Sequence, residues 1–339
     1  IDYDWSHSMA LDGSGNVYIT GMFTQTTDFD PGADTFNLTS TYAGSAFILK
    51  LDSSGAFVWV KNMGGIGPNG AEGESICLDG SGNIYTMGNF VGTVDFDPGV
   101  GTDTLTSTAH GPIFISKLNS YGNFIWAKNI GGKGNEHGNG MVIDRSGNVY
   151  TTGSITDTAD FDPGVDTFNL IASGAEEIFI SKLDASGNFA WAKELASTTG
   201  SGRANFIALD VYRNVYITGF FWGNIDFDPG AGTYNLTSNA NSLDIFISKL
   251  GRYNIGINES SNQKLFSVFP NPATNQINII AGISLLGSMY SISDPMGKIV
   301  LSAELISEKT TIELGAFSSG VYLFSVGGDA RQTFKVIKQ

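Results

Sequence analysis

The feature that most constrains this 339-residue sequence is a block of about 66 residues that recurs four times. Two of its segments, NVYITG at 16–21 and FILKL at 47–51, return at the same step with small changes. Because several landmarks share one period, the sequence predicts a repeat architecture in which each unit packs against its neighbours. The clearest landmark, DFDPG, occurs at 28–32, 95–99, 160–164 and 226–230.

Apolar and polar residues alternate within each repeat. In NVYITG, Val17 and Ile19 share one face of an extended chain, while Tyr18 and Thr20 share the other. Clusters such as DGSGN at 12–16 separate these segments and contain the residues that hairpin turns require. Each repeat therefore predicts four strands, with an extra extended stretch around DFDPG between the second and third. A four-stranded antiparallel unit repeated in this way is a propeller blade.

The predicted fold is all-β: a β-propeller-like array of four-stranded repeats followed by an Ig-like β-sandwich. We expect the array to span residues 1–250, a linker to span 251–264 and the second domain to span 265–339. The fourth repeat stops after its third strand, and the sequence opens partway through a repeat. We therefore expect residues upstream of Ile1 to supply the missing strand, alone or with further blades. The four blades are expected at about 6–63, 74–130, 138–195 and 203–250.

The repeats resemble a known bacterial group. GSGNVYITG, AFILKLDSSG and a Trp-containing strand are similar to the propeller repeats called SBBP over roughly residues 6–250. Trp59, Trp126 and Trp191 recur at one position, which predicts packing between blades. Four visible repeats are fewer than the seven blades that the resemblance implies, so the number of blades stays open.

The last 75 residues do not follow the 66-residue repeat. FPNPATNQINI at 269–279, YSISDPMGKIVL at 290–301 and LGAFSSGVYLFSV at 314–326 closely resemble the type A C-terminal sorting domain of the type IX secretion system of Bacteroidota. The resemblance implies export across the outer membrane, with residues 265–339 read by the type IX machinery. It also implies release from the cell or attachment at its surface, and leaves open whether the domain is cleaved.

The negative charge lies on the repeats. Residues 257–339 contain six acidic and six basic residues, so the net charge of −15 belongs to the preceding part of the chain. Such a surface repels phosphate backbones, and we expect no nucleic-acid partner. No apolar run reaches the roughly 18 residues of a transmembrane helix, so no transmembrane segment is expected.

The DFDPG motif is the candidate cofactor site. Two aspartates at positions i and i+2 of an extended chain point to the same side, with Cα atoms roughly 6.5–7 Å apart. Carboxylates so placed are able to share Ca²⁺, which takes six to eight oxygen ligands. Asp-Pro-Gly is also a favoured β-turn sequence, so a purely structural motif is the alternative. The candidate calcium ligands are Asp28, Asp30, Asp95, Asp97, Asp160, Asp162, Asp226 and Asp228.

Catalytic motifs are lacking. The sequence has no HExxH, GxSxG or Walker element, and its single cysteine, Cys77, predicts a small buried residue. No catalytic residue is therefore predicted, and the expected role is non-enzymatic binding of a glycan or a surface protein, adhesion or a scaffold. His7, His137, Glu72, Glu74 and Glu136 fall in comparable loops before the first strand of a repeat, whereas His110 lies elsewhere.

Paired acids hydrolyse glycosides, so these loops leave one alternative open. It is an extracellular hydrolase or lyase that acts on polysaccharide at the mouth of the propeller. Polar residues that break the repeat and converge at one mouth would favour such an enzyme, whereas evenly repeated ones would favour a scaffold.

Overall fold

In the computed structural model, every regular element among the described residues is a β-strand, which confirms the predicted fold class. The chain divides into two compact units, residues 1–210 with 215–249 and residues 211–214 with 250–339. Of the expected linker, only Gly251 is among the described residues. No helix in the described part of the chain is long and apolar enough to cross a membrane. The structure describes residues 3–40, 44–65, 70–107, 111–173, 175–197, 199–211, 213–239, 242–251, 266–281, 287–295, 297–326 and 332–339.

The repeats form four antiparallel blades. Blade 1 contains β1 (Trp5–Leu11), β2 (Val17–Phe23), β5 (Ser45–Leu51) and β6 (Phe57–Gly65). Blade 2 contains β7 (Gly70–Leu78), β8 (Ile84–Val91), β11 (Ile113–Leu118) and β12 (Phe124–Gly132). Blade 3 contains β13 (His137–Ile143), β14 (Val149–Ile155), β17 (Glu177–Leu183) and β18 (Phe189–Leu195). Blade 4 has three described strands, β19 (Ser201–Leu209), β20 (Val215–Trp222) and β23 (Asp244–Leu250).

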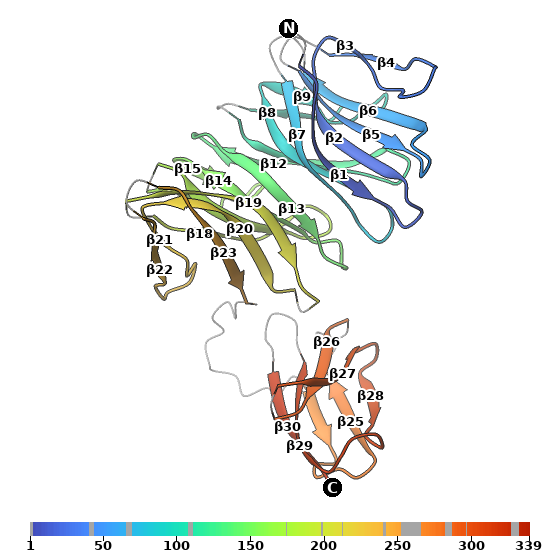
Figure 1. Cartoon of the computed structure of the whole chain (residues 1–339), viewed down its shortest axis with the longest axis vertical. Helices are drawn as coiled ribbons and strands as arrows, with labels where there is room; N and C mark the ends of the chain where they lie inside the picture. The colour runs from blue at the N-terminus through green and yellow to red at the C-terminus, as the bar shows by residue number, and fades with distance from the viewer. Residues whose placement is uncertain are drawn as a thin grey trace. The chain divides into compact units, whose positions relative to one another are not determined.

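The first strands of successive blades lie against one another. β1 contacts β7, β7 contacts β13, and β13 contacts β19 (Figure 1). We call these four the inner strands, and β6, β12 and β18 the outer strands. Side chains at the ends of the inner strands are therefore brought together from different blades.

The stretch around DFDPG forms a short hairpin in each of the four repeats, and two of these hairpins extend the sheet of the preceding blade. β9 pairs with the outer strand β6 of blade 1 through Gly64–Asp95 and Gly65–Val94. In the same way, β15 pairs with β12 of blade 2. Both sheets thus gain two strands, and an otherwise open outer edge is covered. The hairpins are β3 (Thr26–Asp28) with β4 (Asn37–Thr39), β9 (Thr93–Asp95) with β10 (Thr104–Thr106), β15 (Thr158–Asp160) with β16 (Asn169–Ile171), and β21 (Asn224–Asp226) with β22 (Asn235–Thr237).

Two of the three recurrent tryptophans, Trp59 and Trp126, pack between blades, as the sequence predicts. Trp126 contacts Tyr85 of its own blade edge to face, with ring centroids 6.1 Å apart. Gly187, in a turn of blade 3, lies so close that a Cβ atom there would be 3.3 Å from the Trp126 ring. Gly122 of blade 2 meets Trp59 of blade 1 in the same manner.

Blades 1 and 4 each have one uncovered apolar face. Met9 is 70% exposed, whereas Ile76, its equivalent in blade 2, is 3% exposed. Ile245 of blade 4 is 85% exposed, whereas Ile178 of blade 3 is fully buried. A neighbouring blade covers these positions inside the array, so the described residues alone form an open array and not a closed ring.

The C-terminal unit is a two-sheet β-sandwich, as expected. One sheet contains β24 (Phe266–Phe269), β25 (Gln276–Ala281) and β28 (Lys309–Glu313). The other contains β27 (Ile299–Glu304), β26 (Met289–Ser293), β29 (Gly320–Val326) and β30 (Gln332–Lys338). The Asn271 side chain donates to the Lys335 carbonyl at 2.7 Å and accepts from the Ile337 amide at 2.8 Å. The Pro-Asn-Pro segment is thereby held to the final strand.

Candidate functional site

The DFDPG aspartates accept hydrogen bonds from their own turn. Oδ1 of Asp95 accepts from the amides of Asp97 at 3.0 Å and Asp103 at 2.9 Å. Oδ1 of Asp97 accepts from the Gly99 amide at 2.8 Å. The pairs Asp28–Asp30, Asp160–Asp162 and Asp226–Asp228 make the equivalent bonds. All eight carboxylates therefore stabilise the loop, and calcium binding by them stays a prediction.

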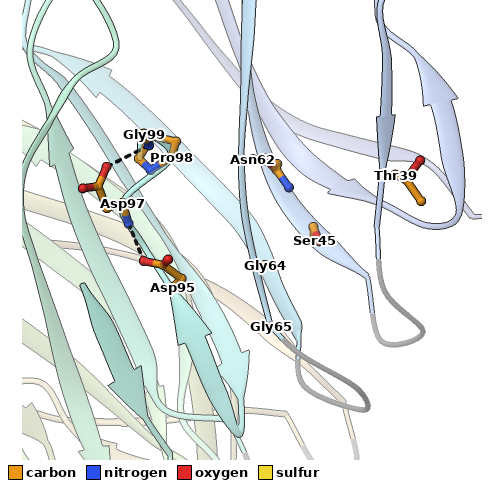
Figure 2. A pocket seen from close by; sticks show the side chains of 9 residues that line it. All are labelled: Thr39, Ser45, Asn62, Gly64, Gly65, Asp95, Asp97, Pro98 and Gly99. Atoms are coloured by element: carbon orange, nitrogen blue, oxygen red, sulfur yellow. Dashed lines mark hydrogen bonds between the residues drawn. The ribbon is translucent and has the colours of Figure 1, made fainter. Parts of the chain in front are cut away.

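The motif in blade 2 also lines a polar pocket of about 210 Å³ beside the outer strand of blade 1. Figure 2 shows the side chains of Asp95, Asp97 and Asn62 there, with the two aspartates joined through the Asp97 amide. Thr39 and Ser45 add hydroxyl groups. The lining thus offers carboxylate, amide and hydroxyl oxygens, which suit a polar ligand or a hard cation. The remaining lining residues are Gly64, Gly65, Pro98 and Gly99.

The DGSGN segments are hairpin turns, as their Asp, Gly and Asn residues predict. Asp12 accepts hydrogen bonds from the Ser14 amide at 2.9 Å, the Asn16 amide at 3.0 Å and the Asn16 side chain at 2.8 Å. These bonds, first of all the one from the Asn16 side chain, hold the pKa of Asp12 below its usual value. The carboxylate acts as a cap for the turn.

Each inner strand has a β-bulge at one equivalent position. The pairing register shifts on either side of His7 in β1 and Glu74 in β7. The same shift occurs at Asn139 in β13 and at Asn205 in β19. A bulge changes the direction of its side chain, and bulges are common beside functional sites. The same bulge therefore positions a histidine in blade 1, a glutamate in blade 2 and an asparagine in each of blades 3 and 4.

Charged side chains gather at these bulges. His7 Nε2 lies 2.8 Å from Glu72 Oε1, and His7 Nδ1 lies 3.6 Å from Glu74 Oε2. Arg203 Nη2 of blade 4 lies 2.6 Å from Glu176 Oε1 of blade 3. These residues do not recur at the equivalent positions of the other blades, so each ion pair is specific to the junction at which it lies. We call His7, Glu72, Glu74, His137, Glu176 and Arg203 the inner-strand cluster.

Electrostatic coupling connects the members of the cluster. Burial raises the pKa of Glu74 and the Glu72 carboxylate adds to this effect, while His7 and Arg203 oppose it. Burial and the Arg203 charge lower the pKa of His137, against the effect of Glu176. The His137 imidazole is therefore neutral at neutral pH, and Arg203 acts on both sides of the cluster.

The expected position of these residues is corrected by the structure. His7, Glu72, Glu74 and His137 were predicted in loops, but they lie within strands β1, β7 and β13, where the bulges interrupt the alternation on which the prediction depended. His110 lies outside the described residues.

Arg203 and Glu176 were missed by the sequence analysis. Arg203 could have been found by aligning the repeats on their NVYITG-type strands. In that alignment Arg203 occupies the same inner-strand position as Glu72 and His137. Nothing in the local sequence pattern indicates Glu176.

Cys77 shows no sign of reactivity. Its Sγ donates to the Met141 carbonyl at 3.0 Å, and burial raises the pKa of the thiol to about 12. The thiol is therefore protonated at neutral pH and serves packing between blades 2 and 3.

Glu136 is a fully buried carboxyl group just before β13, separate from the cluster. Neither of its carboxylate oxygens has a well-formed hydrogen bond from the described residues. Burial raises the pKa of Glu136 to about 7, although the nearby amides of Gly132 and Gly134 oppose the shift. Since the folded-state pKa exceeds the ordinary value of 4.5, this group favours the folded state only while it is protonated.

We expect Glu136 to make the repeat unit less stable as the pH rises from about 4.5 through 7. Glu136→Gln, which mimics the protonated form, is expected to remove this dependence and to increase the free energy of unfolding above pH 7 by up to about 3 kcal/mol. Urea denaturation at several pH values measures both effects. An unchanged pH profile in the variant would contradict the assignment.

Family models match two segments of the chain. Residues 267–339 match the model described as secretion system C-terminal sorting domain. The tail is a type IX sorting domain. Residues 125–162 match the beta-propeller repeat SBBP, from the outer strand of blade 2 to the hairpin of blade 3. Both resemblances that the sequence analysis stated are confirmed.

Similar proteins add little to this assignment. An uncharacterized WD repeat-containing protein, L264 of Acanthamoeba polyphaga mimivirus, is 26% identical over 228 residues, which are 58% of this chain and 16% of the relative. PorZ of Porphyromonas gingivalis, a surface component of its type IX secretion system, is 13% identical with a TM-score of 0.26, over 98% of this chain and 45% of PorZ. Dimeric latent PorU of the same organism is 12% identical with a TM-score of 0.17, over 98% of this chain and 32% of PorU.

The chain thus spans less than half the length of each of these proteins, and the two TM-scores support no argument. The sorting domain itself is informative. It directs secretion and attachment to the cell surface, and it is handled by the type IX machinery. The chain is a propeller-repeat protein with a role at the surface.

Proposed function

We propose that the repeats are a non-enzymatic binding module held at the cell surface, and that the polar pocket of Figure 2 binds a glycan or a polar segment of a surface protein. The observation that carries the proposal is the lining of the pocket. Carboxylate, amide and hydroxyl groups there match the hydroxyl groups of sugars, which act as both donors and acceptors. Export to the surface brings such ligands within reach.

The test is binding of the purified chain to a glycan array and to surface extracts, with one variant and one matched control. Asn62→Ala removes an amide from the pocket and is expected to weaken binding at least about tenfold. Asn129→Ala changes the equivalent residue of blade 2, which does not line the pocket, and should leave binding unchanged. Equal binding by both variants would contradict the pocket assignment.

Calcium at the DFDPG motif is part of this proposal. Asp95 and Asp97 line the same pocket, and its hydroxyl and amide oxygens offer further ligands of the kind that Ca²⁺ takes. If the ion binds, Ca²⁺ raises the melting temperature of the EDTA-treated chain, and Asp97→Asn reduces the rise. A melting temperature that is the same in EDTA and in Ca²⁺ would refute calcium binding and leave the turn as the function of the motif.

One observation favours a second candidate function, a hydrolase or lyase that acts on polysaccharide. The inner-strand cluster combines two histidines, three carboxylates and an arginine that do not recur from blade to blade. Such a set supplies general acids and bases for glycoside cleavage. Release of reducing ends from polysaccharides, lost in His7→Ala, would support this candidate over simple binding.

Deletion of residues 267–339 is expected to abolish display of the repeats at the cell surface, because the sorting domain directs their export. The measurement is immunodetection on intact cells compared with lysed cells. As a control, Asn62→Ala leaves the tail intact and should be displayed normally. Normal display of the truncated chain would contradict the assignment.

A further inference from the structure

We propose that His7, Glu72 and Glu74 bind one divalent transition-metal ion of the zinc class between the inner strands of blades 1 and 2. One ligand atom from each residue lies within 4.8 Å of the other two. Among the residues that the structure describes, no other three His, Cys, Asp or Glu side chains come this close to one another. The eight DFDPG aspartates do not form such a group.

The donor set determines the class of ion. An imidazole nitrogen with two carboxylate oxygens suits zinc and neighbouring transition metals, whereas Ca²⁺ prefers oxygen ligands alone. Zinc bonds to such atoms are about 2.0–2.2 Å long, which places the ligands of a tetrahedral site roughly 3.3 Å apart. A single imidazole gives one nitrogen to one ion. Nε2 of His7 lies 2.8 Å from Glu72 and Nδ1 lies 3.6 Å from Glu74, and the three ligand atoms, one from each residue, lie within 4.8 Å of one another.

Side-chain rotations that close these separations by up to roughly 1.5 Å place all three donors on one ion. The three side chains are 28–30% exposed, which leaves them room to rotate and leaves the ion an open position for water.

The backbone pre-organises two of the three ligands. His7 and Glu74 occupy the bulge positions of adjacent inner strands. Trp5 contacts the His7 ring edge to face, with ring centroids 6.3 Å apart, and limits its movement. Without a cation, the two carboxylates repel each other beside a single imidazole, so a doubly charged ion lowers the free energy of this arrangement.

Other junctions between blades lack this donor set. At the junction of blades 3 and 4, the bulge residue Asn139 donates to the Ala204 carbonyl at 2.9 Å, and Arg203 occupies the position equivalent to Glu72. A cationic guanidinium at that place excludes a metal ion. The donor set at blades 1 and 2 is therefore an individual feature of this junction and not a consequence of the repeat.

The test uses the full chain, treated with EDTA and dialysed, without any glycan. Zn²⁺ is titrated in competition with a chromophoric chelator, and Co²⁺ is titrated with its visible absorption as the readout. We expect one equivalent of either ion to bind, with Co²⁺ bands typical of a nitrogen and oxygen site. His7→Ala, Glu72→Gln and Glu74→Gln should each lower the affinity at least about tenfold.

His137→Ala and Glu176→Gln are the matched controls, because they change an imidazole and a carboxylate of the cluster outside the donor set. Both should bind one equivalent as the wild type does. Absence of binding by the wild type, unchanged binding by the three ligand variants, or an equal loss in the controls would overturn the proposal. Circular dichroism verifies folding, and the two Gln variants preserve side-chain volume if His7→Ala fails to fold. Since no glycan is present, the result is independent of the proposed ligand binding.

Discussion

Phe96→Ala is expected to lower the free energy of unfolding of the repeat unit by about 3–5 kcal/mol. Phe96, the aromatic residue of the second DFDPG motif, is fully buried. Its ring centroid lies 5.5 Å from that of Phe90 and 4.7 Å from that of Phe114. The variant therefore loses buried apolar contacts and leaves a cavity between the hairpin and blade 2.

The loss of Phe96 also affects the connection between blades. The hairpin β9–β10 pairs with blade 1 through Gly64–Asp95 and Gly65–Val94, and Phe96 packs it against Phe114 of its own blade. Denaturation followed by tryptophan fluorescence measures the change. Val100→Ala, in the same loop but fully exposed, is the control and should change stability by less than about 0.5 kcal/mol. Similar losses in both variants would show that burial of Phe96 contributes little to the stability of the repeat unit.

Gly88→Ala is expected to destabilise blade 2 by about 1–3 kcal/mol or more, because the added methyl group collides with the backbone. A Cβ atom at Gly88 would lie 1.8 Å from the Glu72 carbonyl oxygen. Gly153 of blade 3 approaches the His137 carbonyl equally closely. The last glycine of each NVYITG-type strand is therefore required by the bulged inner strand beside it.

The same substitution is expected to displace Glu72 and Glu74, and so to weaken Zn²⁺ binding together with stability. Gly80→Ala is the matched control, since no atom lies within 4 Å of a Cβ atom there. Denaturation midpoints and the zinc titration measure the two effects. If Gly88→Ala is as stable as Gly80→Ala and binds zinc equally well, the close approach is not a constraint on the fold.

Both expected losses come from contacts that the repeat itself supplies, whereas the donor set proposed for the metal ion comes from positions that depart from the repeat. The bulge recurs in all four inner strands, but its side chain changes from His7 to Glu74 and then to Asn139 and Asn205. The repeated backbone thus carries a different side chain at the same bulge position in different blades.

The sequence by itself determined the strands, the turns and the tail. The period of two in NVYITG identifies a strand, and the DGSGN residues identify a turn, because both depend on neighbours a few residues apart. The sorting domain was recognisable because its motifs are contiguous in the sequence. These features need no knowledge of which strands pair.

Only the tertiary structure decided the pairing of the β9–β10 and β15–β16 hairpins with the preceding blade and the assembly of the inner-strand cluster. His7 and Glu72 lie 65 residues apart, and Glu176 and Arg203 come from different blades. The bulges that direct these side chains break the local alternation from which faces are predicted. Contacts of this kind depend on how separate sheets pack, and packing is a property of the whole fold and not of any local pattern.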